Sequence, residues 1–252
     1  MDVDYAAIYP RLFAGHWWWR SRETVILDEL ERLQPDGDWG TILDVGCGEG
    51  LFFETLSRFG EVEGVERGGP FPRSAAEPRW KIHRQAFEDS AFDPGRRYRL
   101  ILMLDVLEHI DDPVRSLRKA EALLQPDGTL LVTVPAYRLL WTYHDDLNDH
   151  RTRFTRTSLK AVVDPTGLEI RHMRYFFHWI FPVRILIRLY ETLSGRNLGP
   201  PRIPAPRINR WLIGFSRLEH KLLRRLRIPF GSSLLMVAGH GLGRTVPKGG
   251  TS

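Results

Sequence analysis

Apolar residues along the chain gather in short segments that predict strands, at residues 41–45, 62–66, 80–83, 98–104 and 129–134. The segment at 98–104 is a continuous apolar run, as is typical of a parallel strand buried on both faces of a sheet. Between these segments, apolar positions recur at helical spacing, for example at Val25, Ile26, Leu30 and Leu33, and at Val114, Leu117, Ala120 and Leu124. Strands that alternate with helices predict an open, doubly wound parallel sheet whose ligand binds at the carboxyl ends of the strands.

Two more strands are predicted near the end of the chain, at residues 167–174 and 232–238. About 55 residues separate them, far more than an ordinary connection. This segment holds apolar residues at helical spacing among arginines on either side of a proline-rich linker, residues 199–206. We therefore predict two amphipathic basic helices, inserted between strands six and seven.

A glycine-rich turn follows the first predicted strand. Asp44 ends that strand, and Gly46, Gly48 and Gly50 follow at every second position. Glycine in such a turn permits positive φ and close approach of a ligand, and the start of the following helix offers free N–H groups. Glu66 ends the next strand, at the spacing expected of an acidic residue that hydrogen-bonds ribose hydroxyls.

These features, together with the run from Leu100 to Ile110, resemble the class I methyltransferases that use S-adenosylmethionine (AdoMet). The resemblance covers residues 40–175. It implies an α/β, Rossmann-like, seven-stranded doubly wound sheet, parallel except for an antiparallel last strand, with AdoMet as the cofactor. The cofactor-binding residues that it implies are Asp44, Gly46, Cys47, Gly48, Gly50, Glu66, Phe87, Glu88, Leu104, Asp105 and His109.

Asp105, Glu108 and His109 stand at i, i+3 and i+4, on one face of any helical turn that begins there. They are similar to an acid-x-x-Glu-His set in ubiquinone-biosynthesis O-methyltransferases, where a divalent cation has been associated with the site. Those enzymes have Glu where this chain has the shorter Asp105. We therefore expect these side chains to hydrogen-bond and pack without a metal, with Asp105 in the AdoMet pocket.

The stretch after strand five, residues 141–154, is dense in polar and ionisable side chains, as is typical of a substrate loop. It also resembles a His-Asp…His-x-Arg segment found in a large branch of class I methyltransferases. His150 and His144 are the candidate general bases because histidine titrates near neutrality, and Asp145 would orient one of them. The alternative is a network that only pins the loop. Substrate contacts are expected from Trp18, Tyr137, Trp141, Arg151 and Arg153.

Trp18 belongs to a run of three tryptophans, residues 17–19, which cannot all face one core from a helix or a strand. At least one of them should cover a ligand or an added segment, unless all three simply pack the N-terminal helix against the sheet. The expected parts of the chain are an N-terminal helical cap (1–39), an AdoMet-binding core (40–175), a basic helical insertion (176–230), the last core strand (231–239) and a disordered tail (240–252).

The composition is that of a globular protein, with 252 residues of which 42% are apolar. The acidic start lacks the apolar stretch of a secretory signal, and the single cysteine, Cys47, is expected to be structural. These observations predict a cytoplasmic location. The net charge of +5 is unevenly distributed along the chain. Residues 171–230 contain 13 Arg and Lys and two acidic residues, a net charge of +11, and the remainder of the chain carries −6.

The basic insertion has several possible roles. It is expected to cap the active site over a lipophilic acceptor, or to contact an anionic membrane surface peripherally through residues 176–228, or to form a homodimer. A structural insertion with solvated arginines is the plain alternative.

The sequence predicts methyl transfer to a small or lipid-like acceptor, most simply at oxygen with a histidine base. A nucleic-acid methyltransferase is the first rival, given the basic segment. Residues 104–109 lack the Asp/Asn-Pro-Pro-aromatic motif of amino-methylating DNA enzymes, so no nucleic-acid partner is expected. The second rival is a non-catalytic AdoMet-fold scaffold that docks through its basic helices.

Overall fold

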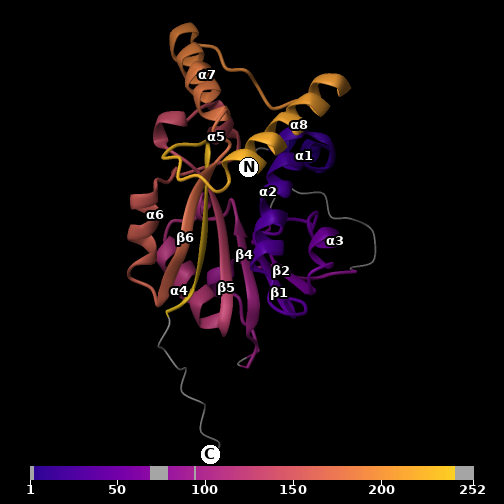
Figure 1. Ribbon diagram of the computed structural model, residues 1–252, viewed down its shortest axis with the longest axis vertical. Coiled ribbons are helices and arrows are strands. Elements are labelled where there is room, and N and C mark those ends of the chain that lie inside the picture. Colours follow the sequence, from indigo (N-terminus) through magenta and orange to yellow (C-terminus); the bar gives the residue numbers. More distant parts are fainter. Residues whose placement is uncertain (1–2, 69–78, 94, 242–252) are drawn as a thin grey trace, which may run out of the picture.

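The computed structural model describes residues 3–68, 79–93 and 95–241. Its centre is a seven-stranded sheet in the order β3-β2-β1-β4-β5-β7-β6 (Figure 1). The strands are β1 (Thr41–Val45), β2 (Glu61–Val65), β3 (Lys81–His83), β4 (Tyr98–Leu104), β5 (Leu124–Pro135), β6 (Leu168–Phe176) and β7 (Ser233–His240). Strands β1 to β5 pair in parallel, and β7 runs antiparallel to β5 and β6. The predicted sheet, with its antiparallel last strand, is confirmed.

Helices cover both faces of the sheet because successive residues of each central strand point to opposite sides. Ile42 and Leu100 pack with α2 (Trp17–Leu33) and α3 (Phe53–Leu56). Leu43 and Ile101 pack with α4 (Pro113–Leu123) and α6 (Arg156–Val163) on the other side. All four strand residues are fully buried. The continuous apolar runs in the sequence therefore mark strands with a core on each face.

The N-terminal part consists of α1 (Val3–Gly15) and α2. Helix α2 begins earlier than the apolar spacing indicates, because His16 caps it by accepting a hydrogen bond from the Trp18 backbone N–H through Nδ1 at 3.2 Å. The tryptophan run then divides. Trp19 is buried, Trp18 packs near Phe177, and Trp17 packs on Trp179, which comes from the segment after β6.

Two helices lie between β6 and β7, as predicted: α7 (Ile180–Ser194) and α8 (Pro206–Leu223). Figure 1 shows both at the end of the molecule where α1 and the start of α2 lie. Helix α8 packs against α2, where His220 Nε2 lies 3.2 Å from a carboxylate oxygen of Asp28 and Arg224, just past the end of α8, forms an ion pair with the same carboxylate. No helix in the described part of the chain is long and apolar enough to cross a membrane.

Other expectations fall partly outside the described residues. The predicted tail lies outside them apart from residues 240 and 241. The helix expected after the glycine turn is short and is regular only in α3. The domain boundaries remain a prediction.

Candidate active site

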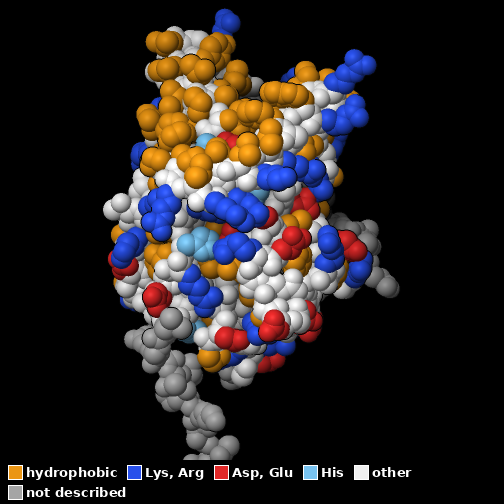
Figure 2. All heavy atoms as spheres, viewed as in Figure 1, with side chains coloured by type: hydrophobic (Ala, Val, Ile, Leu, Met, Phe, Trp, Pro, Cys, Tyr) orange, Lys and Arg blue, Asp and Glu red, His pale blue; other side chains and the backbone are white. Residues whose placement is uncertain are grey.

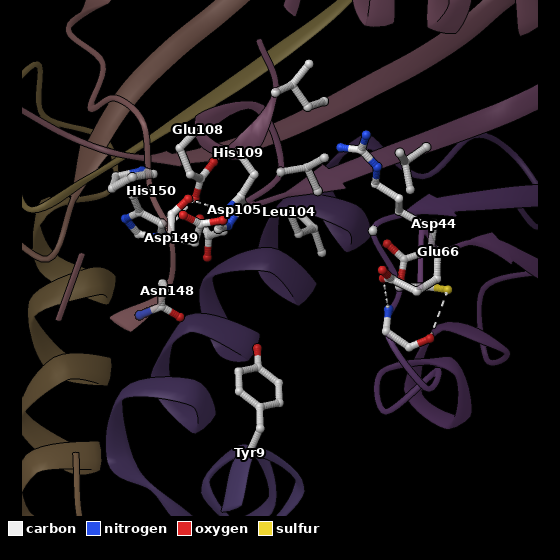
Figure 3. Close-up of a pocket in the computed structure, with 18 of the residues that line it drawn as sticks. Tyr9, Asp44, Glu66, Leu104, Asp105, Glu108, His109, Asn148, Asp149 and His150 are labelled. Atoms are coloured by element: carbon white, nitrogen blue, oxygen red, sulfur yellow. Dashed lines mark hydrogen bonds and ion pairs between the residues drawn. The ribbon is translucent and has the colours of Figure 1, made fainter. Parts of the chain in front are cut away.

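A cavity of about 880 Å³ opens at the carboxyl ends of β1, β2 and β4. Its size lies within the roughly 300–1,000 Å³ of ligand pockets. The glycine turn, the segment after β4, residues 144–153 and helices α1 and α2 all contribute to its wall. Figure 3 shows two groups of polar side chains in it, Asp44 and Glu66 on one side and Glu108, His109 and His150 on the other. The cavity therefore has two chemically distinct ends.

The glycine turn forms one end with a backbone that other residues would not adopt easily. Gly46 and Gly48 have φ of 73° and 55°. A Cβ on Gly46 would lie 2.6 Å from the Val106 side chain, whereas a Cβ on Gly48 would meet nothing within 4 Å. Burial raises the pKa of the Cys47 thiol, which therefore stays protonated. The turn leaves an open cradle at Gly48.

Glu66 and Asp44 flank this cradle. A carboxylate oxygen of Glu66 accepts a hydrogen bond from the Gly48 backbone N–H at 2.8 Å. Asp44 is 4% exposed, and burial raises its pKa to about 7, with Arg22 opposing the rise and Glu66 adding to it. A glycine cradle flanked by two carboxyl groups fits a ligand that carries both ribose hydroxyls and an amino group, as AdoMet does.

Phe87 and Glu88 line the wall beside the cradle. Phe87 is buried, and the Lys119 ammonium lies 5.3 Å from its ring centroid. Glu88 accepts a hydrogen bond from the Ser116 hydroxyl of α4. Contacts with Lys119 and Ser116 of α4 therefore hold the Phe87 and Glu88 side chains in place.

Asp105, directly after β4, has a left-handed backbone with φ of 59°. Its carboxylate accepts a hydrogen bond from the Thr133 hydroxyl at 3.1 Å and forms an ion pair with Arg22 of α2, whose Nε lies at 2.8 Å. This carboxylate joins the N-terminal helix to the sheet at the edge of the cavity.

Glu108, His109 and His150 form a second cluster, whose nearest ligand atoms lie within 4.8 Å of one another. Glu108 is fully buried, and neither carboxyl oxygen has a hydrogen-bond partner among the described residues. Burial and the neighbouring Asp105 charge raise the pKa of Glu108 well above its usual range. Burial, followed by the effect of His150, lowers the pKa of His109 to about 4. These are the described residues that could hold a metal, and the expectation of no metal stays a prediction.

His150 contacts Asp145, the residue expected from the sequence to orient one of the two histidines. His150 Nδ1 lies 2.8 Å from Asp145 Oδ1, and Asp145 is fully buried. Arg153 donates two hydrogen bonds to the same carboxylate, at 2.8 and 3.1 Å, and Arg184 of α7 approaches to 3.4 Å. Burial alone would raise the pKa of Asp145, but the His150 hydrogen bond and the two arginines outweigh it and lower the pKa.

His144 has a different environment. Its ring packs edge-on against Tyr5, and its Nε2 lies 3.2 Å from the Asn148 side-chain nitrogen. Burial, followed by the Arg184 charge, lowers its pKa to about 3. The His144 imidazole is therefore neutral and a weak proton acceptor.

The structure brings most of the predicted site residues to this cavity, but not all. Those that line it are Trp18, Asp44, Gly46, Cys47, Gly48, Glu66, Phe87, Glu88, Leu104, Asp105, His109, His144, His150, Arg151 and Arg153. Gly50 packs on Phe53 behind the turn, and Asp145 lies behind His150. The Trp141 indole N–H donates to Asp146 at 2.9 Å, and the Tyr137 hydroxyl donates to the Pro229 carbonyl. Neither aromatic residue lines the cavity.

Other lining residues were not singled out from the sequence as members of the site: Tyr5, Tyr9, Trp19, Arg22, Asn148 and Arg184. Tyr9 points toward the cavity from α1 in Figure 3. The i, i+4 spacing of Tyr5 and Tyr9 was a usable signal, because it places both on one helix face. Arg22 and Arg184 gave no such signal, because their acidic partners lie far away in the sequence.

Comparisons with known proteins agree with this geometry. Residues 18–173 match the family described as "Methyltransferase domain". The chain belongs to this family, and its glycine turn and sheet order make it a class I AdoMet-dependent methyltransferase, as the sequence resemblance predicts.

Curated relatives include a ubiquinone biosynthesis O-methyltransferase from Vibrio campbellii, 26% identical over 62% of this chain and 78% of its own length. The corresponding enzyme from Aeromonas salmonicida is 26% identical over 68% of this chain and 84% of its own length. A solved Haloferax volcanii methyltransferase, in complex with the Trm112 methyltransferase activator, covers 96% of this chain and 97% of its own, at 18% identity and a TM-score of 0.60. At such identity the structural likeness concerns the fold.

Proposed function

We propose that this methyltransferase transfers the methyl group of AdoMet to an oxygen atom of a small or lipid-like acceptor, with His150 as the general base. The observation that carries the proposal is the hydrogen bond from His150 to the buried Asp145 at the cavity wall. The names of the curated relatives, O-methyltransferases of a small-molecule pathway, support oxygen as the methylated atom.

The cofactor end of the cavity would hold AdoMet through the glycine turn, Asp44 and Glu66, with Phe87 along the same wall. When bound, AdoMet supplies a methyl group activated by its sulfonium. The protein's remaining task is to orient the acceptor and to take its proton.

His150 is suited to take that proton because Asp145 occupies its Nδ1. A hydrogen bond to the carboxylate puts the ring hydrogen on Nδ1 and leaves the lone pair of Nε2 available. Asp145 is a positioning residue, and it also stabilises the imidazolium that forms. The low pKa of His144 makes that histidine the weaker candidate.

The acceptor end combines an aromatic wall with an accessible arginine. Tyr9, Phe13 and Trp18 line the cavity and suit an apolar acceptor. The Arg153 side chain is 1% exposed and donates to Asp145, so it supports the base. Arg151 is 44% exposed and lies at the wall beside Asp111, where it could bind an acidic group of the acceptor.

The test is a methyl-transfer assay that follows S-adenosylhomocysteine (AdoHcy) release over a panel of phenols, carboxylic acids and amphiphilic alcohols. With any acceptor that is turned over, His150→Gln should lower kcat by roughly a hundredfold or more and leave AdoHcy affinity within about twofold. His144→Gln is the matched control. A larger kcat loss in His144→Gln than in His150→Gln would overturn the assignment of the base.

A further inference from the structure

Helix α8 is amphipathic in the opposite sense to an ordinary surface helix. Its two buried side chains are polar: the Trp179 indole donates to the Ser216 hydroxyl at 3.2 Å, and Glu219 accepts from the Trp179 backbone N–H at 2.7 Å. Most of its apolar side chains face outward, beside exposed arginines and a lysine. The exposed ones are Ile208, Trp211, Phe215, Leu218 and Leu222, at alternating spacings of three and four.

Helix α7 repeats this arrangement. Its polar residues Arg184, Arg188 and Glu191 point to the protein, where Arg188 donates to the Arg138 carbonyl at 2.8 Å and Glu191 accepts from the Tyr143 backbone N–H at 3.1 Å. Its exposed apolar residues are Val183, Leu186, Leu189, Tyr190 and Leu193, the last of them 85% exposed. Both helices thus turn their apolar faces away from the core, where an ordinary surface helix would bury them.

These two faces form one apolar platform at an end of the molecule, and we call it the α7–α8 platform. Figure 2 shows hydrophobic side chains gathered over both helices, with lysines and arginines around and below them. The exposed cations of α8 and its flanks are Arg202, Arg207, Arg210, Arg217, Lys221, Arg225 and Arg227. An apolar surface of this kind marks an interaction site.

We propose that the α7–α8 platform docks on the surface of an anionic phospholipid membrane. An interfacial helix needs an apolar face that enters the headgroup region and basic residues that meet anionic lipid, and α8 with its flanks supplies both. Trp211 and Phe215 are exposed and stacked, with ring centroids 5.3 Å apart, and aromatic rings of this kind favour the headgroup level.

The charge of the insertion favours lipid over a second copy of the chain. Residues 171–230 carry +11, so two such platforms would face each other with like charge. An anionic bilayer meets both properties of the platform, because it attracts the cations and accepts the apolar side chains. Nucleic acid would satisfy the charge and leave Leu218 and Leu222 in water.

Docking would also bring the cavity close to the membrane, because helix α7 contributes to both the cavity and the α7–α8 platform. Arg184 of α7 lines the cavity and donates to the Thr142 hydroxyl at 2.8 Å, and Leu186, two residues on, belongs to the platform.

The experiment is co-sedimentation of the full chain with vesicles of phosphatidylglycerol and phosphatidylcholine, and with vesicles of phosphatidylcholine alone. The wild-type protein should bind the anionic vesicles and lose affinity as salt is raised. Trp211→Ser/Leu218→Ser/Leu222→Ser and Arg210→Gln/Lys221→Gln/Arg225→Gln should each bind at least about tenfold more weakly. Arg58→Gln/Arg118→Gln/Lys160→Gln, which removes the same charge elsewhere, should bind like the wild type.

AdoHcy binding, measured on every variant, shows that each is folded, so a failure of docking can be told apart from a failure of the cofactor site. The proposal is overturned if the wild-type protein does not bind anionic vesicles, or if the control triple loses binding equally. It is also overturned if sedimentation shows a dimer that the Trp211 triple variant abolishes, or if RNA binds and displaces the vesicles.

Discussion

Asp145 and His150 lie side by side, with Oδ1 of the carboxylate 2.8 Å from Nδ1 of the imidazole, and the carboxylate is fully buried. The same carboxylate accepts from Arg153 Nε at 2.8 Å. One buried charge therefore orients a proposed catalytic group and neutralises a buried guanidinium. Function and stability should both respond to its removal.

We expect Asp145→Asn to lower the free energy of unfolding by about 3–5 kcal/mol, because it leaves the buried Arg153 charge unpaired. The measurement is urea unfolding at neutral pH. Asp146→Asn is the matched control, since this exposed neighbour should change stability by less than about 1 kcal/mol. Equal losses in the two variants would show that the Asp145 pairing adds nothing.

Glu29 of α2 should make the fold sensitive to acid. It is 2% exposed and meets His172 at 2.9 Å and Arg174 at 3.2 Å. Burial alone would raise the pKa of Glu29, but the His172 hydrogen bond, Arg174 and Arg32 outweigh it and lower the pKa to about 2. Because the folded pKa lies below the usual 4.5, the ionised group stabilises the fold above pH 4.5, and this contribution is lost as the pH falls toward 2.

Glu29→Gln should therefore reduce stability by roughly 3 kcal/mol at pH 7 and flatten its decline between pH 4.5 and 2. Glu31→Gln, an exposed neighbour on the same helix, is the control. Unfolding followed by circular dichroism across this pH range checks the prediction. An unchanged pH profile in Glu29→Gln would contradict it.

Asp44 should couple ligand binding to proton release. Burial raises its pKa to about 7, so a large fraction of the free protein carries a neutral Asp44 at pH 6. AdoHcy has a cationic α-amino group, which favours the ionised form of a neighbouring carboxyl. Binding at pH 6 should release up to about one proton, and binding at pH 8 much less. Calorimetry in buffers of different ionisation enthalpy measures this, and Asp44→Asn should remove the difference between the two pH values.

Alanine substitutions at Gly48 and Gly64 should have different main effects, one on AdoHcy affinity and the other on stability. Gly48→Ala adds a Cβ to open space at the cradle, so AdoHcy affinity should fall while stability drops by only about 1–2 kcal/mol from the positive φ. A Cβ on Gly64 would lie 2.4 Å from Cys47 Sγ and 2.5 Å from the Phe53 ring, so Gly64→Ala should chiefly destabilise the fold. Thermal melts and AdoHcy titrations of both variants distinguish the two effects. Similar stability losses in both would refute this account of the turn.

The sequence alone predicted those features that depend on residues close together in the chain. Alternating runs predict the sheet, and the spacing from Asp44 to Glu66 follows from one strand, a turn and the next strand. The amphipathic character of α8 was visible too, but not its orientation, because periodicity does not tell which face of a helix meets the protein. The pairing of Arg22 with Asp105 is set by tertiary packing between distant segments, which the sequence pattern does not reveal.

The central claim, that the cavity at the glycine turn binds AdoMet, is tested most directly by isothermal titration with AdoHcy. We expect the wild-type protein to bind, Glu66→Gln to bind at least about tenfold more weakly through loss of a charge-assisted hydrogen bond, and Glu61→Gln, at the exposed start of β2, to bind like the wild type. A folded wild-type protein that binds no AdoHcy would contradict the account.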